Sequence, residues 1–140
     1  FSIHDVIETL KRNRYAPVFF HGHNDLGLAA ANSLAAVYAG ADGLDLTVNG
    51  LGDRAGNAAL EQVVMALQIK GFDTGISLKD LIPLSKTVEN TSGVSISKLA
   101  PIVGEYAFCH KSPSHIKFPQ LFESFDPEQI GTARKMLISE

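Results

Sequence analysis

The first 70 residues alternate between helix-like and strand-like segments, and this order leaves few folds open. Apolar residues follow helical spacing from Phe1 to Arg14, and Ser2 is placed to cap that helix. Pro17 then prevents the helix from continuing, and Val18–Phe20 forms a short run of β-forming residues. The chain therefore opens with a helix followed by a strand.

A second helix, strand and helix follow at similar spacing. The sequence predicts helices over Leu26–Ala39 and Ala58–Lys70, with a strand over Leu44–Val48 between them. Asn24 and Asp25 are placed to cap the first of these helices. Because parallel neighbours need a long return connection, this order predicts parallel strands joined by helical crossovers, an α/β fold.

The pattern changes after residue 71. We expect two parts, 1–71 and 72–140, of which the second is a linker followed by mostly helical structure. A helix is predicted over Leu78–Asn90 with Pro83 in its first turn, and another begins at Asp126. A TIM barrel needs about 250 residues, whereas this chain has 140 and starts at Phe rather than Met. If it belongs to a barrel, we expect it to be a fragment or a processed piece.

Charge and composition exclude several classes of partner. The chain carries 12 basic and 15 acidic residues, a net charge of −3, so it lacks the basic patch that nucleic-acid binding requires. Its apolar runs are too short to span a membrane, and its charged N-terminal segment is no signal peptide. The single cysteine, Cys109, excludes an internal disulfide and favours a reducing compartment, so we expect a cytoplasmic protein.

Two histidines lie where the first strand ends and its helix begins. Residues i and i+2 of a strand point to the same face, so His21 and His23 present their imidazoles together. Ligands bind at this edge of α/β sheets. Two neutral imidazoles hold a divalent ion when carboxylates or water complete the shell. The pattern alone also fits two surface or capping histidines.

A glycine-rich loop, 49–57, follows the second strand. Its glycines allow a backbone path that β-carbons would block. Asn57 is placed to cap the next helix and to turn its amide oxygen toward a metal, and Arg54 can pair with Asp53 or with a substrate carboxylate. The loop contains neither glycine motif of phosphate-binding sites. An ordinary glycine-rich turn with a helix cap is the alternative.

In this order, HGHNDLGLAAANSLAAVYAGA and TVNGLGDRAGNAALEQVVMAL resemble the signature pair of the homocitrate synthase/isopropylmalate synthase family. Downstream, PIVGEYAFCHKS and FESFDPEQIG resemble the subdomain of that family, closer to homocitrate synthases. The family consists of metal-dependent, acetyl-CoA-condensing TIM-barrel enzymes. The resemblance implies the last two βα units of a TIM barrel followed by a mostly helical subdomain.

The resemblance also implies roles for individual residues. His21 and His23 match the two metal-binding histidines of barrel strand seven, and Asn57 matches an asparagine in or beside the metal shell. The third ligand, an aspartate on strand one, has no counterpart here. The implied cofactor is a divalent ion (Zn, Mg or Mn) that polarises the substrate. The implied substrates are acetyl-CoA and a 2-oxo acid, with 2-oxoglutarate favoured over 2-oxoisovalerate.

The subdomain departs from the family around its catalytic histidine. The Ser-Gly-x-His stretch of the family reads SPSH here, so His115 still matches as an acid/base, while Pro113 fixes φ where the glycine is free. Phe122 stands where the family commonly has a tyrosine, which removes a hydroxyl proton donor. The alternative for His115 is a loop histidine without a catalytic role, and we expect His110 to be structural.

Two functions therefore stay open. The chain is the C-terminal half of a homocitrate-synthase-like acyltransferase that acts in amino-acid biosynthesis or nitrogen fixation and needs an N-terminal half, or it is a non-catalytic remnant or interaction subunit. A 2-isopropylmalate-synthase-like fragment is a further alternative. Both strands leave backbone groups unpaired, so we expect a complementary N-terminal half-chain or self-association.

Overall fold

The computed structural model describes residues 2–13 and 16–137. Its contacts divide the chain into two compact units, 1–72 and 73–140, one residue from the boundary predicted at 71/72. No helix in the described ranges is long and apolar enough to cross a membrane.

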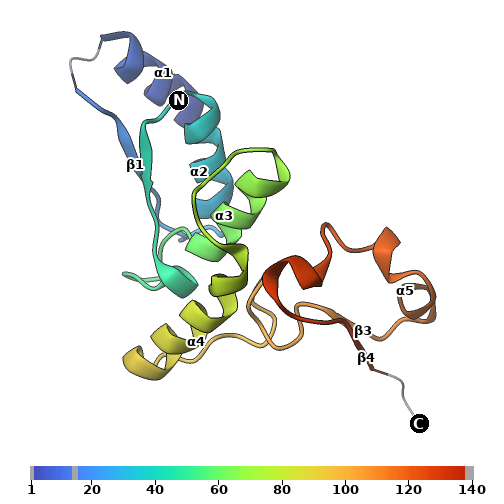
Figure 1. Ribbon diagram of the computed structural model, residues 1–140. Helices are drawn as coiled ribbons and strands as arrows, with labels where there is room; N and C mark the ends of the chain where they lie inside the picture. The colour runs from blue at the N-terminus through green and yellow to red at the C-terminus, as the bar shows by residue number, and fades with distance from the viewer. Residues whose placement is uncertain (1, 14–15, 138–140) are drawn as a thin grey trace. The chain divides into compact units, whose positions relative to one another are not determined.

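The first unit is built on two parallel strands with helices on one side (Figure 1). β1 spans Phe19–His21 and β2 spans Gly43–Asp45. α1 (Ile3–Asn13) and α3 (Leu60–Ile69) both pack on α2 (Ala29–Tyr38), and α2 contacts both strands. The order helix, strand, helix, strand, helix predicted from the sequence is confirmed.

The strand register decides which side chains share a face. Phe20 pairs with Leu44, and Leu44 packs on the helices. His21 pairs with Asp45, so both side chains lie on the other face together with Phe19, which is 62% exposed. One face of the pair therefore carries the core, and the other is open within this unit.

The core of the first unit lies between the strands and the helices. Its buried members are small or branched apolar residues from α2 and α3 and from the segment between β2 and α3. They are Ala29, Ala58, Val63 and Leu67, with Leu34, Val37, Leu44 and Leu46 packed against them.

The start of α2 differs from the prediction. The helix begins at Ala29 instead of Leu26, because a tight turn comes first: the Gly27 N–H donates to the Asn24 carbonyl, and Gly27 is left-handed with φ 73°. The Asn24 side-chain oxygen then accepts from the Ala29 N–H at 3.2 Å. The N-cap position itself is Leu28, which makes no side-chain cap bond, so the caps predicted at Asn24 and Asp25 are not at the cap position. Asn24 instead reaches the first N–H of the helix from within the preceding turn.

The second strand is also shorter than predicted. It ends at Asp45, and the chain then turns to meet the start of α3. The Thr47 N–H donates to the Ala58 carbonyl at 3.1 Å, and the Thr47 carbonyl accepts from Leu60 at 2.9 Å. Val48 already belongs to a 3₁₀ turn, so the alternating pattern that predicted a strand to Val48 extends beyond the ladder.

The second unit contains helices, turns and one small sheet. α4 spans Leu81–Ser92, with Pro83 in its first turn as predicted, and α5 spans Pro113–Lys117. β3 (Cys109–His110) and β4 (Lys135–Met136) form a parallel pair that the mostly helical prediction did not include. The helix predicted from Asp126 is a 3₁₀ turn, one of four in the chain's described part: Val48–Gly50, Leu78–Asp80, Pro119–Leu121 and Pro127–Ile130.

Candidate metal centre at the end of the first strand

His21 and His23 lie side by side at the carboxyl end of β1. Their ring centroids are 4.9 Å apart and the ring planes are nearly perpendicular, at 84°. Both residues are exposed. His23 also forms an isolated antiparallel bridge with Asn57. The structure therefore brings together the three residues that the sequence proposed as metal ligands.

Asn57 is buried, and its amide oxygen has no hydrogen-bond partner among the described residues. Its amide nitrogen makes only a long contact, 3.5 Å, to the Leu51 carbonyl. A buried acceptor without a donor costs about 1–3 kcal/mol. The oxygen can therefore accept a cation or a hydrogen-bond donor from outside the described residues.

The predicted helix cap at Asn57 is wrong. The residue before α3 is Ala59, and no side chain caps this helix end. The Asn57 side chain turns toward the loop instead, because Gly52 leaves room for it. A β-carbon at Gly52 would lie 2.6 Å from the Asn57 side-chain amide carbon.

Main-chain hydrogen bonds hold the glycine-rich loop against the end of β1. The Asn24 N–H donates to the Gly56 carbonyl at 2.8 Å, and the Ala58 N–H donates to the Gly22 carbonyl at 3.0 Å. These bonds flank Asn57 on both sides in sequence. They fix the distance between the loop and the histidines without any side-chain contribution.

The loop reaches this shape through several left-handed residues. Asn49, Gly50, Arg54 and Gly56 have φ values of 60°, 66°, 57° and 88°. Asparagine, as at Asn49, is one of the few residue types that tolerate the left-handed region, and the two glycines adopt it without steric cost. Gly56 is also confined, because a β-carbon there would collide with the Gly50 carbonyl.

Arg54 pairs with Asp25 rather than with Asp53. Its Nε donates to Oδ1 at 2.7 Å and a terminal nitrogen donates to Oδ2 at 2.9 Å, a two-pronged contact. The hydrogen bond from Arg54 lowers the pKa of Asp25. This contact links the turn before α2 to the glycine-rich loop. The predicted role of Arg54 toward a substrate carboxylate stays a prediction.

Glu61 is a residue that the sequence analysis missed. It is 3% exposed on α3, and its carboxylate accepts the Asn49 N–H at 3.1 Å. Burial raises the pKa of Glu61, and the hydrogen bond from Asn49 opposes this effect. The one signal in the sequence was an acidic residue beside the apolar run Val63–Leu67. Glu61 holds the left-handed turn at which the loop begins.

The residues present fit part of a divalent-metal shell. Imidazole nitrogens and an amide oxygen are ligands that several divalent ions accept. Across residues 2–13 and 16–137, however, no group of three His, Cys, Asp or Glu side chains is placed to hold an ion. The remaining ligands would have to be water or groups from elsewhere.

His115, the predicted acid/base, lies in the second unit on α5. Pro113 occupies the first turn of this helix, a position that suits a fixed φ. The His115 ring stacks on Phe122 with centroids 3.7 Å apart and planes at 11°. The face of the Phe122 ring therefore supports the imidazole. The hydroxyl that a tyrosine would carry is absent.

A hydrogen-bonded chain formed by His110, Glu123 and Arg134 lies beside His115. The Glu123 carboxylate contacts His110 Nε2 at 2.8 Å and accepts from Arg134 Nε at 2.7 Å. The side chains of His110 and Glu123 are 8% and 7% exposed. The His110 ring lies 5.9 Å from that of His115. Only contacts between distant segments reveal Glu123, so no local pattern could have identified it.

The family of the chain follows from comparison with known proteins. The family model described as HMGL-like matches residues 1–88, more than half of the sequence. The chain belongs to the HMGL-like family. The matched region contains both strand ends, the histidine pair and the glycine-rich loop.

Named relatives support the resemblance seen in the sequence. The chain is 44% identical to Homocitrate synthase AksA of Methanopyrus kandleri, over 89% of this chain and 32% of the relative. It is 46% identical to a Probable 2-isopropylmalate synthase of the same organism, over 89% of this chain and 26% of the relative. Among solved structures it resembles the Bacillus subtilis HMG-CoA lyase, with a TM-score of 0.60 and 29% identity over 67% of this chain and 34% of that one. The chain thus spans about a third or less of each.

We predict that Gly56→Ala destabilises the first unit more than Gly71→Ala does. Both glycines are left-handed, with φ 88° and 84°, but a β-carbon at Gly71 meets no atom within 4 Å. The collision with Gly50 adds about 1–3 kcal/mol at position 56. Urea unfolding of both variants measures the difference, and equal losses would show that the loop has room to relax.

We also predict that Glu61 makes the first unit less stable as pH rises. Because the folded-state pKa of Glu61 is raised, its contribution is complete below the unfolded-state pKa and is lost as pH increases through the folded-state value. Glu61→Gln keeps an oxygen for Asn49 and should remove this fall. Unfolding free energies at a series of pH values test it, and Glu8→Gln, a half-exposed carboxylate that pairs with Arg12 on α1, is the control. An unchanged slope in Glu61→Gln contradicts it.

Proposed function

We propose that the chain is the C-terminal part of a homocitrate-synthase-like acyltransferase. The enzyme condenses acetyl-CoA with a 2-oxo acid, of which 2-oxoglutarate is favoured. The observation that carries this proposal is the grouping of His21, His23 and the unpartnered Asn57 oxygen in a chain of the HMGL-like family. In this proposal the two βα units are the last two of a TIM barrel.

The histidine pair and Asn57 would hold the divalent ion. His21 and His23 each offer a ring nitrogen, and Asn57 offers the amide oxygen that has no partner in the described structure. When bound, the ion supplies Lewis-acid polarisation of the carbonyl of the 2-oxo acid. The main-chain bonds on either side of Asn57 hold its backbone beside that of His23.

Arg54 would bind a carboxylate of the substrate. A guanidinium has five N–H donors, and Asp25 takes two of them. The two-pronged contact also fixes the plane of the guanidinium, so the remaining donors point in a fixed direction. Asp25 is thus a positioning residue for Arg54.

His115 would act as the acid/base. Phe122 holds one face of the ring at 3.7 Å, and the buried Glu123 keeps the neighbouring His110 in place. The Phe122 ring cannot donate a proton, so the hydroxyl donor that a tyrosine would supply is absent at this position.

The open face of the first unit supports a complementary polypeptide or self-association. Phe19 is 62% exposed on the face that carries His21, and Leu26, which follows the histidine pair in the sequence, is 85% exposed. Apolar side chains of this size gain free energy when a partner covers them. Each of the two strands also has only one neighbour among the described residues.

A chimera tests the activity directly. In the Methanopyrus homocitrate synthase, the aligned region would be replaced by this chain, and release of free CoA would be followed with 2-oxoglutarate and with 2-oxoisovalerate. We expect turnover with 2-oxoglutarate. His21→Ala should lower kcat/KM at least about 100-fold, since loss of outer-shell partners alone costs 10–100-fold. His4→Ala, on the exposed side of α1, is the control.

The two substrates also separate the alternatives. Preference for 2-oxoisovalerate would favour the isopropylmalate-synthase-like function, which the 46% identity to such a relative supports. A folded chimera that turns over neither acid would favour a non-catalytic subunit. Phe122→Tyr adds the missing hydroxyl, and a gain in kcat would show that the phenylalanine limits the reaction.

We predict weak binding of Zn²⁺ or Mn²⁺ by the 140-residue chain itself. Two imidazoles and one amide oxygen form an incomplete shell, so affinity should be low but measurable by calorimetric titration. Asn57→Ala should weaken it about tenfold, and the double change of His21 and His23 to Ala should abolish it. Unchanged affinity in the double variant, with His4→Ala as control, would place the ion elsewhere.

A further inference from the structure

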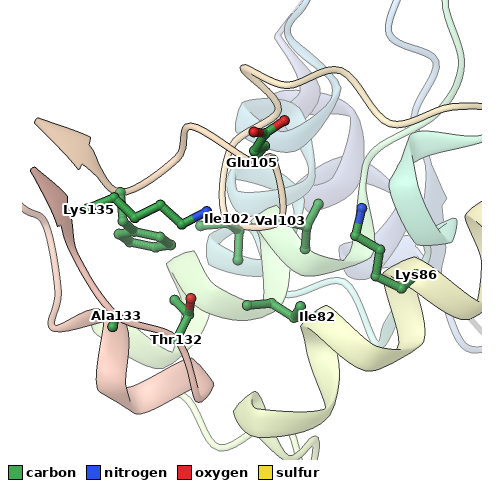
Figure 2. Close-up of a pocket in the computed structure, with 10 residues that line it drawn as sticks. Ile82, Lys86, Ile102, Val103, Glu105, Thr132, Ala133 and Lys135 are labelled. Carbon is green, nitrogen blue, oxygen red and sulfur yellow. The ribbon is translucent and has the colours of Figure 1, made fainter. Parts of the chain in front are cut away.

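The second unit contains a pocket that the proposed function does not use (Figure 2). Its volume is about 350 Å³, within the range of small-molecule sites. Ile82 of α4 and the consecutive Ile102 and Val103 supply apolar walls. Thr132 comes from the segment that leads into β4, and Lys135 is the first residue of β4. Three segments far apart in the sequence thus form one cavity.

The wall at Ile102 is a strained and tightly folded turn. Ile102 has φ 68°, which is a genuine outlier for a β-branched residue. The turn is closed by a hydrogen bond from the Gly104 N–H to the Ala100 carbonyl at 3.0 Å, and a β-carbon at Gly104 would collide with the 98–100 backbone. Such strain persists only where the surroundings hold it. The wall of the pocket at Ile102 is therefore held in place by the residues around it.

The charges around the pocket leave one cation uncompensated. Lys86 on the rim pairs with Glu89 at 2.8 Å, and the acidic Glu105 pairs with Lys98 at 3.0 Å. Lys135 forms no ion pair with any residue in the described part of the chain. In Figure 2 its side chain extends over the pocket, with the nitrogen toward Ile102. Its main chain is fixed, because its N–H donates to the Phe108 carbonyl at 2.9 Å.

We propose that this pocket binds a small carboxylic acid with a short aliphatic chain. The carboxylate would accept hydrogen bonds from the Lys135 ammonium group and the Thr132 hydroxyl, which Figure 2 shows facing the same space. The aliphatic chain would lie against Ile82, Ile102 and Val103. A single free cation and the absence of arginine from the lining favour a monoanion over a phosphate group.

A matched pair of ligands tests the proposal on the 140-residue chain. 4-Methylpentanoate and 4-methylpentanamide have nearly the same shape, and only the first is charged. We expect saturable NMR shifts in the amide resonances of 102–104 and 132–135 with the acid, and at least tenfold weaker binding of the amide. Acetate, which lacks the aliphatic chain, should also bind at least tenfold more weakly than the longer acid.

Substitutions at the cation complete the test. Lys135→Met should weaken binding of the acid at least tenfold, Lys135→Arg should retain it, and Lys79→Met, exposed in the same unit and outside the pocket, should change it less than twofold. The acid–amide comparison on the unchanged chain stands even if a variant fails to fold. Equal binding of acid and amide, shifts confined to other segments, or no saturable shift would overturn the proposal. Resonances of the pocket that move on dilution alone would also overturn it, because a second copy would then be the occupant.

Discussion

The arrangement of the candidate site depends on two main-chain hydrogen bonds between the end of β1 and the glycine-rich loop. They run from Asn24 to the Gly56 carbonyl and from Ala58 to the Gly22 carbonyl. Because Asn57 lies between the two loop residues, these bonds place its main chain beside that of His23. Its side chain turns toward Gly52, away from the helix end that it would otherwise cap. The buried amide oxygen gives the pair a third potential ligand.

The order of elements in the first unit could be predicted because each one carries a local signal. Helical apolar spacing, a proline between the first helix and the first strand, and capping residues such as Ser2 are local signals in the sequence. The hydrogen bonds that Ser2 and Asp5 exchange confirm the first cap. The end of β2 could not be predicted, because Thr47 leaves the ladder to bond with residues near α3. The β3–β4 pair could not be predicted either, since strands of two residues show no periodicity in the sequence.

The candidate site could be predicted only in part for the same reason. The i, i+2 spacing of His21 and His23 follows from strand geometry and is visible in the sequence. The partner of Arg54 is Asp25, on a different loop, and the partner of Asn49 is Glu61, on the following helix. Both contacts depend on how the loop folds back, which the left-handed residues decide. Sequence spacing thus identifies the candidate ligands, and tertiary contacts decide which acidic residues pair with Arg54 and Asn49 in the loop.

The open face of the first unit connects completion of the fold with completion of the site. Phe19 and His21 lie on the same face, so whatever covers the exposed phenylalanine also approaches the histidines. Each strand has one neighbour among the described residues, so a polypeptide that pairs with the outer edges would satisfy the backbone groups there. It would also exclude water from the imidazoles, and electrostatic interactions with a bound ion grow stronger as water leaves. In the proposed enzyme, folding energy and metal affinity would therefore come from the same contact, and each would be weak in this chain taken by itself.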